Sequence, residues 1–128
     1  MERFTGHITK GDVIVILFPF TDGSDAKPRP VLVIAEETSN LIVCAITHNS
    51  GRDGEIKLDN EDFQEGKLSV VSFVRPNMLL TISKATVKRK VGSVKYSKLQ
   101  EVITELISII NRPASKALPA SKALERPK

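Results

Sequence analysis

GDVIVILFPF (residues 11–20) and KPRPVLVI (residues 27–34) are the two stretches that decide the fold. Each contains an unbroken run of Val, Ile and Leu, which favour extended backbone, and each run is bounded by Gly, Asp or Pro, which form turns. Both runs are far shorter than the roughly 18 apolar residues that a membrane-spanning helix needs. They predict two strands joined by a polar loop.

The same pattern recurs along the first three quarters of the chain. In all it predicts strands at residues 13–18, 31–35, 41–47, 55–58, 68–74, 79–83 and 86–92. The first three are separated by short turn-forming segments and should form a meander. Because many short strands at close spacing favour a barrel or a sandwich, we expect a mainly β fold.

The hydrophobic period changes to that of a helix from Ser97 onward. Apolar residues then recur at spacings of three and four, namely Leu99, Val102, Ile103, Leu106, Ile109 and Ile110. Ser97 suits the N-cap, with Gln100 at the third position of a capping box, and Pro113 follows the last periodic residue. The pattern predicts one C-terminal amphipathic helix that covers a side of the β core.

Residues 1–111 are expected to form one domain, because this length suits a single modest core. The remaining residues, 112–128, contain ASKAL twice and carry five basic side chains against one acidic. Such a segment has too little apolar surface to build a core of its own. We therefore predict that residues 112–128 are a flexible, low-complexity basic tail.

The net charge of +4 comes from this tail, and the neutral remainder is divided unevenly. Residues 1–65 carry six basic and twelve acidic side chains, whereas residues 66–111 carry eight basic and two acidic ones. The densest positive stretch runs from Lys84 to Lys90. It either contacts nucleic-acid phosphates or is an edge strand that its lysines keep soluble.

Several other function classes find no support in the sequence. The N-terminal residues lack the apolar segment of a secretory signal, so we expect a cytoplasmic protein. Cys44 is the single cysteine and lies in an apolar stretch, which predicts a buried, reduced thiol and excludes an internal disulfide. Walker, His-Glu-x-x-His and Gly-x-Ser-x-Gly motifs are missing, and the acidic run 59–62 is interpreted as a solvated loop. We expect neither a metal nor a cofactor.

An ordered set of segments resembles the MazF/PemK toxin family. The segments are Gly11-Asp12 before its apolar strand, Phe18-Pro19-Phe20, Lys27-Pro28-Arg29-Pro30 with the strand after it, Cys44-Ala45-Ile46-Thr47, Ser72-Phe73-Val74-Arg75-Pro76-Asn77, and Val91-Gly92-Ser93-Val94 before the helix. The resemblance covers roughly residues 10 to 110. It implies a small SH3-like β-barrel (MazF/PemK/CcdB-like), a homodimer, metal-independent and sequence-selective cleavage of single-stranded mRNA, and neutralisation by a cognate antitoxin.

Three residues are candidates for catalysis. Arg29 lies between two prolines that hold its backbone extended, and its planar guanidinium suits phosphate oxygens. The resemblance makes Arg29 and Thr47 the catalytic pair, with Thr47 orienting the substrate. His48 adds the one side chain whose ordinary pKa allows proton transfer near neutrality.

Five further residues are candidates for RNA binding, namely Arg75, Asn77, Lys84, Lys88 and Arg89. Asn77 occupies a position where some members of the family carry an aspartate thought to act as the base. An amide cannot accept a proton at neutral pH. We therefore expect either that His48 is the base or that Arg29 and Thr47 act without a dedicated base. The alternatives are a non-catalytic nucleic-acid-binding barrel and a module that only binds an antitoxin.

Overall fold

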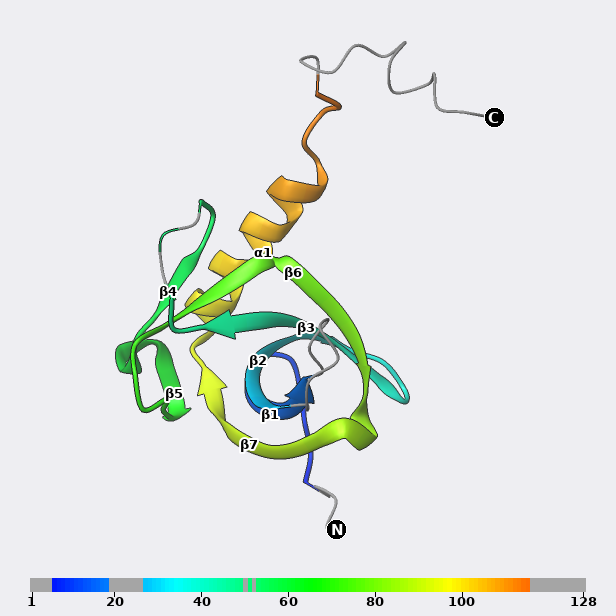
Figure 1. Cartoon of the computed structure of the whole chain (residues 1–128), viewed down its shortest axis with the longest axis vertical. Coiled ribbons are helices and arrows are strands. Elements are labelled where there is room, and N and C mark those ends of the chain that lie inside the picture. Colours follow the sequence, from blue (N-terminus) through cyan, green and yellow to red (C-terminus); the bar gives the residue numbers. More distant parts are fainter. Residues whose placement is uncertain (1–5, 19–26, 50, 52, 116–128) are drawn as a thin grey trace.

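A computed structural model describes residues 6–18, 27–49, 51 and 53–115, and within these ranges the chain forms one curled antiparallel sheet and one α-helix (Figure 1). The strands are β1 (Asp12–Phe18), β2 (Lys27–Glu36), β3 (Asn40–Thr47), β4 (Ile56–Leu58), β5 (Phe63–Gly66), β6 (Ser72–Ser83) and β7 (Val87–Val94). Their order in the sheet is β4-β6-β3-β2-β1-β7-β5. The sheet closes partway into a barrel, and α1 (Tyr96–Ile110) packs outside β6. The expected mainly β barrel with a C-terminal helix is confirmed.

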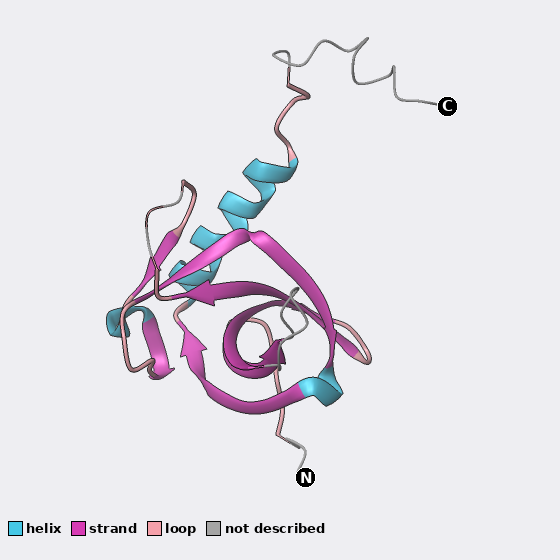
Figure 2. Ribbon diagram, viewed as in Figure 1, coloured by secondary structure: helices cyan, strands magenta, loops and turns pink. Residues whose placement is uncertain are grey.

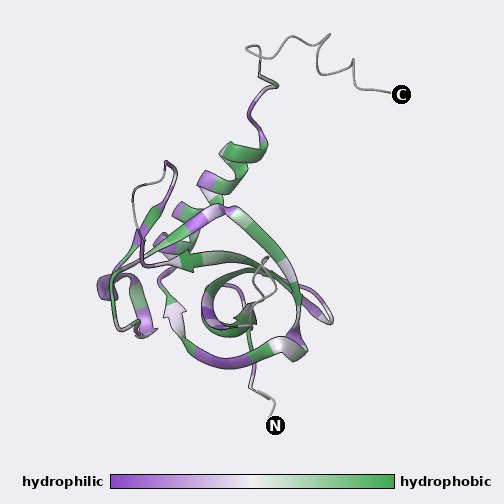
Figure 3. Ribbon diagram, viewed as in Figure 1, coloured by the Kyte–Doolittle hydropathy of each residue, from purple (hydrophilic) through white to green (hydrophobic). Residues whose placement is uncertain are grey.

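The central strands β1, β2 and β3 form the predicted meander and are buried on both faces. Alternate residues of β1 enter different apolar clusters: Val13 joins a helix-side core with Leu99 and Val102 of α1, whereas Ile14 joins a second core with Val33. Hydrophobic residues accordingly dominate β1 and β2, while hydrophilic ones appear along β7 (Figure 3). Burial on both faces explains why these strands are continuous apolar runs rather than alternating ones.

The corner at Gly11 and Asp12 fixes where β1 begins. Gly11 has a φ of 94°, donates its backbone N–H to the Val33 carbonyl (2.8 Å) and accepts from Val94 N–H (2.9 Å). Asp12 is buried, accepts a hydrogen bond from the Thr9 backbone N–H (2.8 Å) and pairs with Lys90 (3.4 Å). The corner therefore ties the start of β1 to both neighbouring strands.

β6 replaces two of the predicted strands. It is one strand of 12 residues that begins at Ser72, so residues 68–71 lie outside it, and it bends midway (Figure 2). Arg75 pairs with Ala45 while Leu79 pairs with Cys44, which leaves residues 76–78 without partners on β3. Pro76 has no N–H to give the ladder, so a bulge forms at this point. The short strand β5 was not predicted.

The helix starts differently from the prediction. It begins at Tyr96 with Lys95 as the N-cap and no side-chain capping bond, so Ser97 does not cap it and Gln100 makes no capping box. The backbone N–H of Lys95 donates to the Asp62 carbonyl at 2.7 Å, and the Lys95 carbonyl accepts from Leu99 N–H at 3.1 Å. This contact with Asp62, and the burial of Leu99, set the start in place of a side-chain cap.

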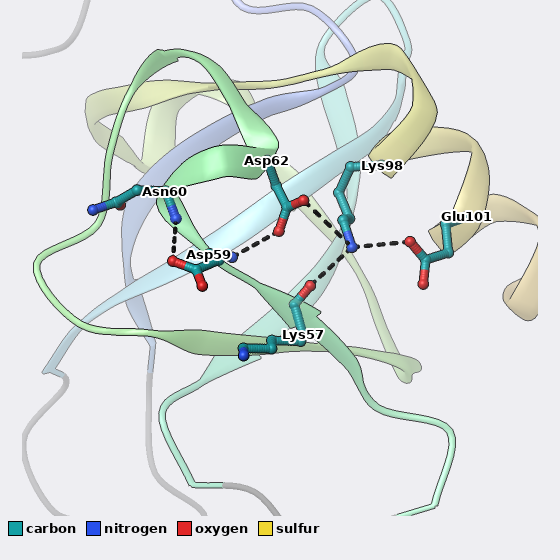
Figure 4. A network of polar contacts seen from close by, with 6 residues as sticks. All are labelled: Lys57, Asp59, Asn60, Asp62, Lys98 and Glu101. Carbon is teal, nitrogen blue, oxygen red and sulfur yellow. Dashed lines mark hydrogen bonds and ion pairs between the residues drawn. The ribbon is translucent and has the colours of Figure 1, made fainter.

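The acidic run 59–62 is at the surface with none of its residues buried, as expected for a solvated segment, and it forms a capped 3-10 turn. The Asp59 side chain accepts from Asn60 N–H at 2.7 Å, and the Asp62 carboxylate accepts from Asp59 N–H at 2.7 Å. Figure 4 shows the Lys98 ammonium of α1 between this turn, β4 and its own helix: it lies 3.7 Å from Asp62, 3.0 Å from the Lys57 carbonyl and 2.9 Å from Glu101. Lys98 therefore joins three elements at one point.

The remaining expectations concern Cys44, membrane-spanning helices and the C-terminal tail. Cys44 is a buried free thiol as predicted, and burial raises its pKa to about 12. Among the described residues, no helix is long and apolar enough to span a bilayer. Most of the predicted tail, 116–128, and the loop 19–26 lie outside the described residues. The boundary at residue 112 stays a prediction.

Candidate functional site

A cleft of about 710 Å³ lies where β2 begins and β3 ends. Its lining comes from β1, β2, β3 and the residue after it, the segment after β5, the start of β6, and β7. It consists of Val15, Lys27, Pro28, Arg29, Pro30, Ile46, Thr47, His48, Lys67, Leu68, Ser69, Val70, Ser72, Arg89 and Val91. Four of these described lining residues are Lys or Arg and none is Asp or Glu. The cleft is therefore electropositive and suits a polyanion.

Arg29 reaches the cleft from the first residues of β2, opposite Ile16 of β1. The β2–β3 ladder pairs Val31 with Ala45, and extending this register by two residues sets Arg29 opposite Thr47. Both residues are half-buried, which limits the freedom of their side chains. The hairpin register thus brings together two predicted catalytic residues that are 18 positions apart in the chain.

Thr47 and His48 form the end of β3 and the start of the following loop. The Thr47 hydroxyl oxygen accepts a hydrogen bond from the Asn49 backbone N–H at 3.1 Å, which fixes that oxygen. Its own proton remains available to donate, because a hydroxyl can accept and donate together. His48 is exposed and lines the same cleft. All three predicted catalytic residues therefore share one site.

Arg89 is the one predicted RNA-binding residue that lines the cleft, and it pairs with Val15 across β1 and β7. Its neighbour Lys90 turns instead to Asp12. Strand alternation thus divides the positive stretch of residues 84–90 between different surroundings. β5 pairs only with residues 92–94 of β7, so residues 87–90 have β1 on one side and, among the described residues, no strand on the other, which agrees with the edge-strand alternative.

The other four predicted RNA-binding residues lie outside the cleft. Arg75 is half-buried on β6, and its Nε is buried with no hydrogen-bond partner among the described residues. Asn77 is exposed in the β6 bulge, and Lys88 is half-buried on β7. Lys84 lies in the turn before β7 and lines a hollow of about 130 Å³ with Gly6, His7 and Ile8. The structure does not bring these residues to Arg29.

Two cations of the cleft were missed by sequence reasoning. Lys27 lies two residues before Arg29 in the same proline-rich motif, and strand alternation places residues two apart on one face, so a signal existed. Lys67 follows β5, which was not predicted, and no pattern in the sequence connects it to β2. Only the folded sheet shows that Lys67 belongs to this site.

Family comparison agrees with this arrangement. Residues 9–110 match the family model described as PemK-like, MazF-like toxin of type II toxin-antitoxin system. The chain belongs to this family. No curated protein is significantly similar to this PemK/MazF-family chain in sequence.

Solved structures share the fold at low sequence identity. An endoribonuclease from a Mycobacterial species is 14% identical, with a TM-score of 0.65 over 88% of this chain and 99% of that one. The MazE-MazF structure (Form-III) from Deinococcus radiodurans is 18% identical, with a TM-score of 0.66 over 83% and 98%. The Mycobacterium tuberculosis toxin MazF-mt6 is 20% identical, with a TM-score of 0.58 over 79% and 99%. At these identities the likeness shows the fold alone.

Proposed function

We propose that this PemK/MazF-family chain is a toxin that cleaves single-stranded mRNA sequence-selectively, without a metal ion. The observation that carries the proposal is the cleft in which Arg29, Thr47 and His48 meet beside three further cations. Membership of the toxin family and endoribonucleases of the same fold support it. The reaction is attack by the substrate's own 2′-hydroxyl on the adjacent phosphorus, with expulsion of the 5′-oxygen.

Arg29 stabilises the negative charge that builds on the phosphorane. Its guanidinium offers parallel N–H donors that match two phosphate oxygens, and it stays charged at any working pH. The two prolines beside it fix the backbone before the substrate arrives, so little reorganisation is needed at the transition state. Replacement of Arg29 by lysine lowers the cleavage rate, because an ammonium lacks this planar fork.

Thr47 and His48 complete the site. The Thr47 oxygen is held by Asn49 N–H, and its hydroxyl proton donates to a phosphate oxygen and so orients the substrate. His48 carries the proton transfer, taking a proton from the 2′-hydroxyl or giving one to the leaving oxygen. Lys27, Lys67 and Arg89 bind the flanking phosphates.

The proposal includes partners. An endoribonuclease from a Mycobacterial species, solved in complex with its cognate antitoxin, has this fold, with a TM-score of 0.62 at 13% identity. We infer that an antitoxin protein also restrains this chain in the cytoplasm, and that the active form is a homodimer. Light scattering at micromolar concentration tests the dimer, and a monomer there would contradict it.

An assay on a long unstructured RNA in excess chelator tests the activity. The wild-type protein should cut it and leave a 2′,3′-cyclic phosphate on the upstream fragment, since no metal-bound water is the nucleophile. Arg29→Ala should cut about two to three orders of magnitude more slowly, the usual loss for one charge-stabilising donor. Arg29→Lys should restore binding more than rate.

Arg112→Ala is the matched control, because Arg112 is exposed beyond α1 and pairs only weakly with Glu105 at 3.8 Å. It should cut at the wild-type rate. Cleavage by Arg29→Ala at the wild-type rate, or a reaction stopped by chelator, contradicts the mechanism. Salt-dependent binding of RNA without any cleavage would instead make the chain a non-catalytic RNA-binding barrel.

A further inference from the structure

We propose that residues 67–70, in the segment between β5 and β6, form the wall of the cleft that holds a base of the RNA, with Val70 as the side chain packed on that base. The inference rests on the proposed function, because it names the part of the same cleft that reads the substrate. Three observations carry it: how this segment is anchored, what it presents, and how the charges of the cleft are distributed.

The segment is anchored at both ends. Gly66, just before it, has a φ of 74°, and a Cβ added there would lie 2.1 Å from the Val91 carbonyl oxygen, so β5 and β7 are in very close contact. After the segment, Ser72 is buried and its hydroxyl donates to the Val70 carbonyl at 3.0 Å. Leu68 packs on the helix-side core between these points. The backbone of the segment is therefore fixed before a ligand binds.

Val70 is an apolar side chain held out into a polar cleft. It is 57% exposed and lines the cleft together with Lys67 and Ser69. Large exposed aliphatic groups on a fixed segment are well placed to lose their water to a ligand. The ligand must therefore offer an apolar surface at this wall.

A single-stranded nucleotide fits this division of the cleft. Arg29 and Arg89 come from β2 and β7 and suit phosphates, whereas the wall of residues 67–70 adds an aliphatic surface with a hydroxyl beside it. An unstacked base has an apolar face and a hydrogen-bonding edge, so Val70 packs on the face and Ser69 bonds the edge. Among the described lining residues there is no Phe, Tyr or Trp, and Val70 takes the place of an aromatic platform.

Val71 offers a matched control. It is the same residue type in the same segment and is 44% exposed, but it does not line the cleft. Val70→Ala and Val71→Ala remove the same two methyl groups from neighbouring exposed positions. A difference between the two variants therefore reports the cleft and not the stability of the segment.

The test measures binding of two uncleavable oligomers of about 12 nucleotides, an ordinary single-stranded DNA and its fully abasic counterpart. Val70→Ala should weaken binding of the base-bearing oligomer about fivefold, the effect of losing part of two buried methyl groups. It should leave the abasic oligomer within about twofold of wild type, and Val71→Ala should leave both unchanged.

Cleavage of an RNA pool with random sequence separates this inference from the proposed function. If the wild type cuts, Val70→Ala should change the base preference at one position beside the cut. If the wild type cuts, and Val70→Ala behaves like Val71→Ala in both the binding and the cleavage assay, the inference is overturned and the proposed function stands. If the wild type does not cut, but Val70→Ala weakens binding of the base-bearing oligomer alone, the inference stands and the proposed function is overturned. A changed oligomeric state in Val70→Ala would make the segment a protein contact and overturn the inference.

Discussion

Replacing Lys98 by methionine should destabilise the fold by about 2 kcal/mol, because one ammonium holds three elements together. Its side chain is 13% exposed and donates to the Lys57 carbonyl at 3.0 Å, a charged hydrogen bond that contributes about 1.5 kcal/mol. The pairs with Asp62 and with the largely exposed Glu101 add roughly 0.5 kcal/mol together. Methionine keeps an unbranched stem and a similar helix propensity, so the change isolates the ammonium.

Denaturant unfolding with a parallel thermal melt measures the effect, and about 2 kcal/mol corresponds to roughly 8 °C in a domain of this size. Lys57→Met is the control within the same network, since Lys57 contributes its backbone carbonyl and its side chain is exposed. It should change stability by less than about 0.5 kcal/mol. If the free energy of unfolding of Lys98→Met lies within about 0.5 kcal/mol of the wild type, the contacts of the Lys98 ammonium do not stabilise the fold and the prediction is refuted.

Three further predictions concern other parts of the chain. Gly66→Ala should lower the free energy of unfolding by more than about 3 kcal/mol, because the added Cβ would lie 2.1 Å from backbone. Gly51→Ala, with nothing within 4 Å of its added Cβ, should lower it by about 1 kcal/mol. Equal losses for the two variants in denaturant melts would refute the β5–β7 contact. Burial raises the pKa of the Cys44 thiol from 9.0 to about 12, so its contribution to the free energy of unfolding should be fully present below pH 9 and should be lost as the pH rises from 9 toward 12. Iodoacetamide at pH 8 should label Cys44 only in denaturant, and rapid labelling of the folded protein would contradict its burial. Truncation after Arg112 should change the free energy of unfolding by less than about 0.5 kcal/mol, and a loss above roughly 1 kcal/mol would show that the tail docks.

The elements that sequence reasoning found are those whose signal is local. β1, β2 and β3 are long apolar runs, and the helix has a clear period, so both were predictable. β5 was missed because Phe63–Gly66 contains one hydrophobic residue and a glycine, and it is a strand because β7 offers it a partner. The helix start depends on the carbonyl of Asp62, which no local motif announces.

The candidate site shows the same division. Arg29 and Thr47 were singled out from the resemblance, and the β2–β3 register sets them together. Lys84 and Lys88 were chosen because the charge density of residues 84–90 is high, but density along a strand ignores alternation, and only Arg89 of the stretch lines the cleft. Lys67 is brought in by tertiary structure alone.

The Gly11–Asp12 corner has a consequence for the uniqueness of the fold. A strand that is apolar on both faces gains little from one alignment over an alignment shifted by one residue, since hydrophobic groups meet hydrophobic groups in either case. A shift of β7 against β1 would nevertheless turn Arg89 away from the cleft. A buried carboxylate with a single cationic partner tolerates one alignment, because any other leaves the charge unpaired in the interior. Asp12 thus selects one alignment of β7 on β1: its contribution lies less in how stable the fold is than in which of several nearly equivalent sheets is populated, and so in which cations of β7 reach the cleft.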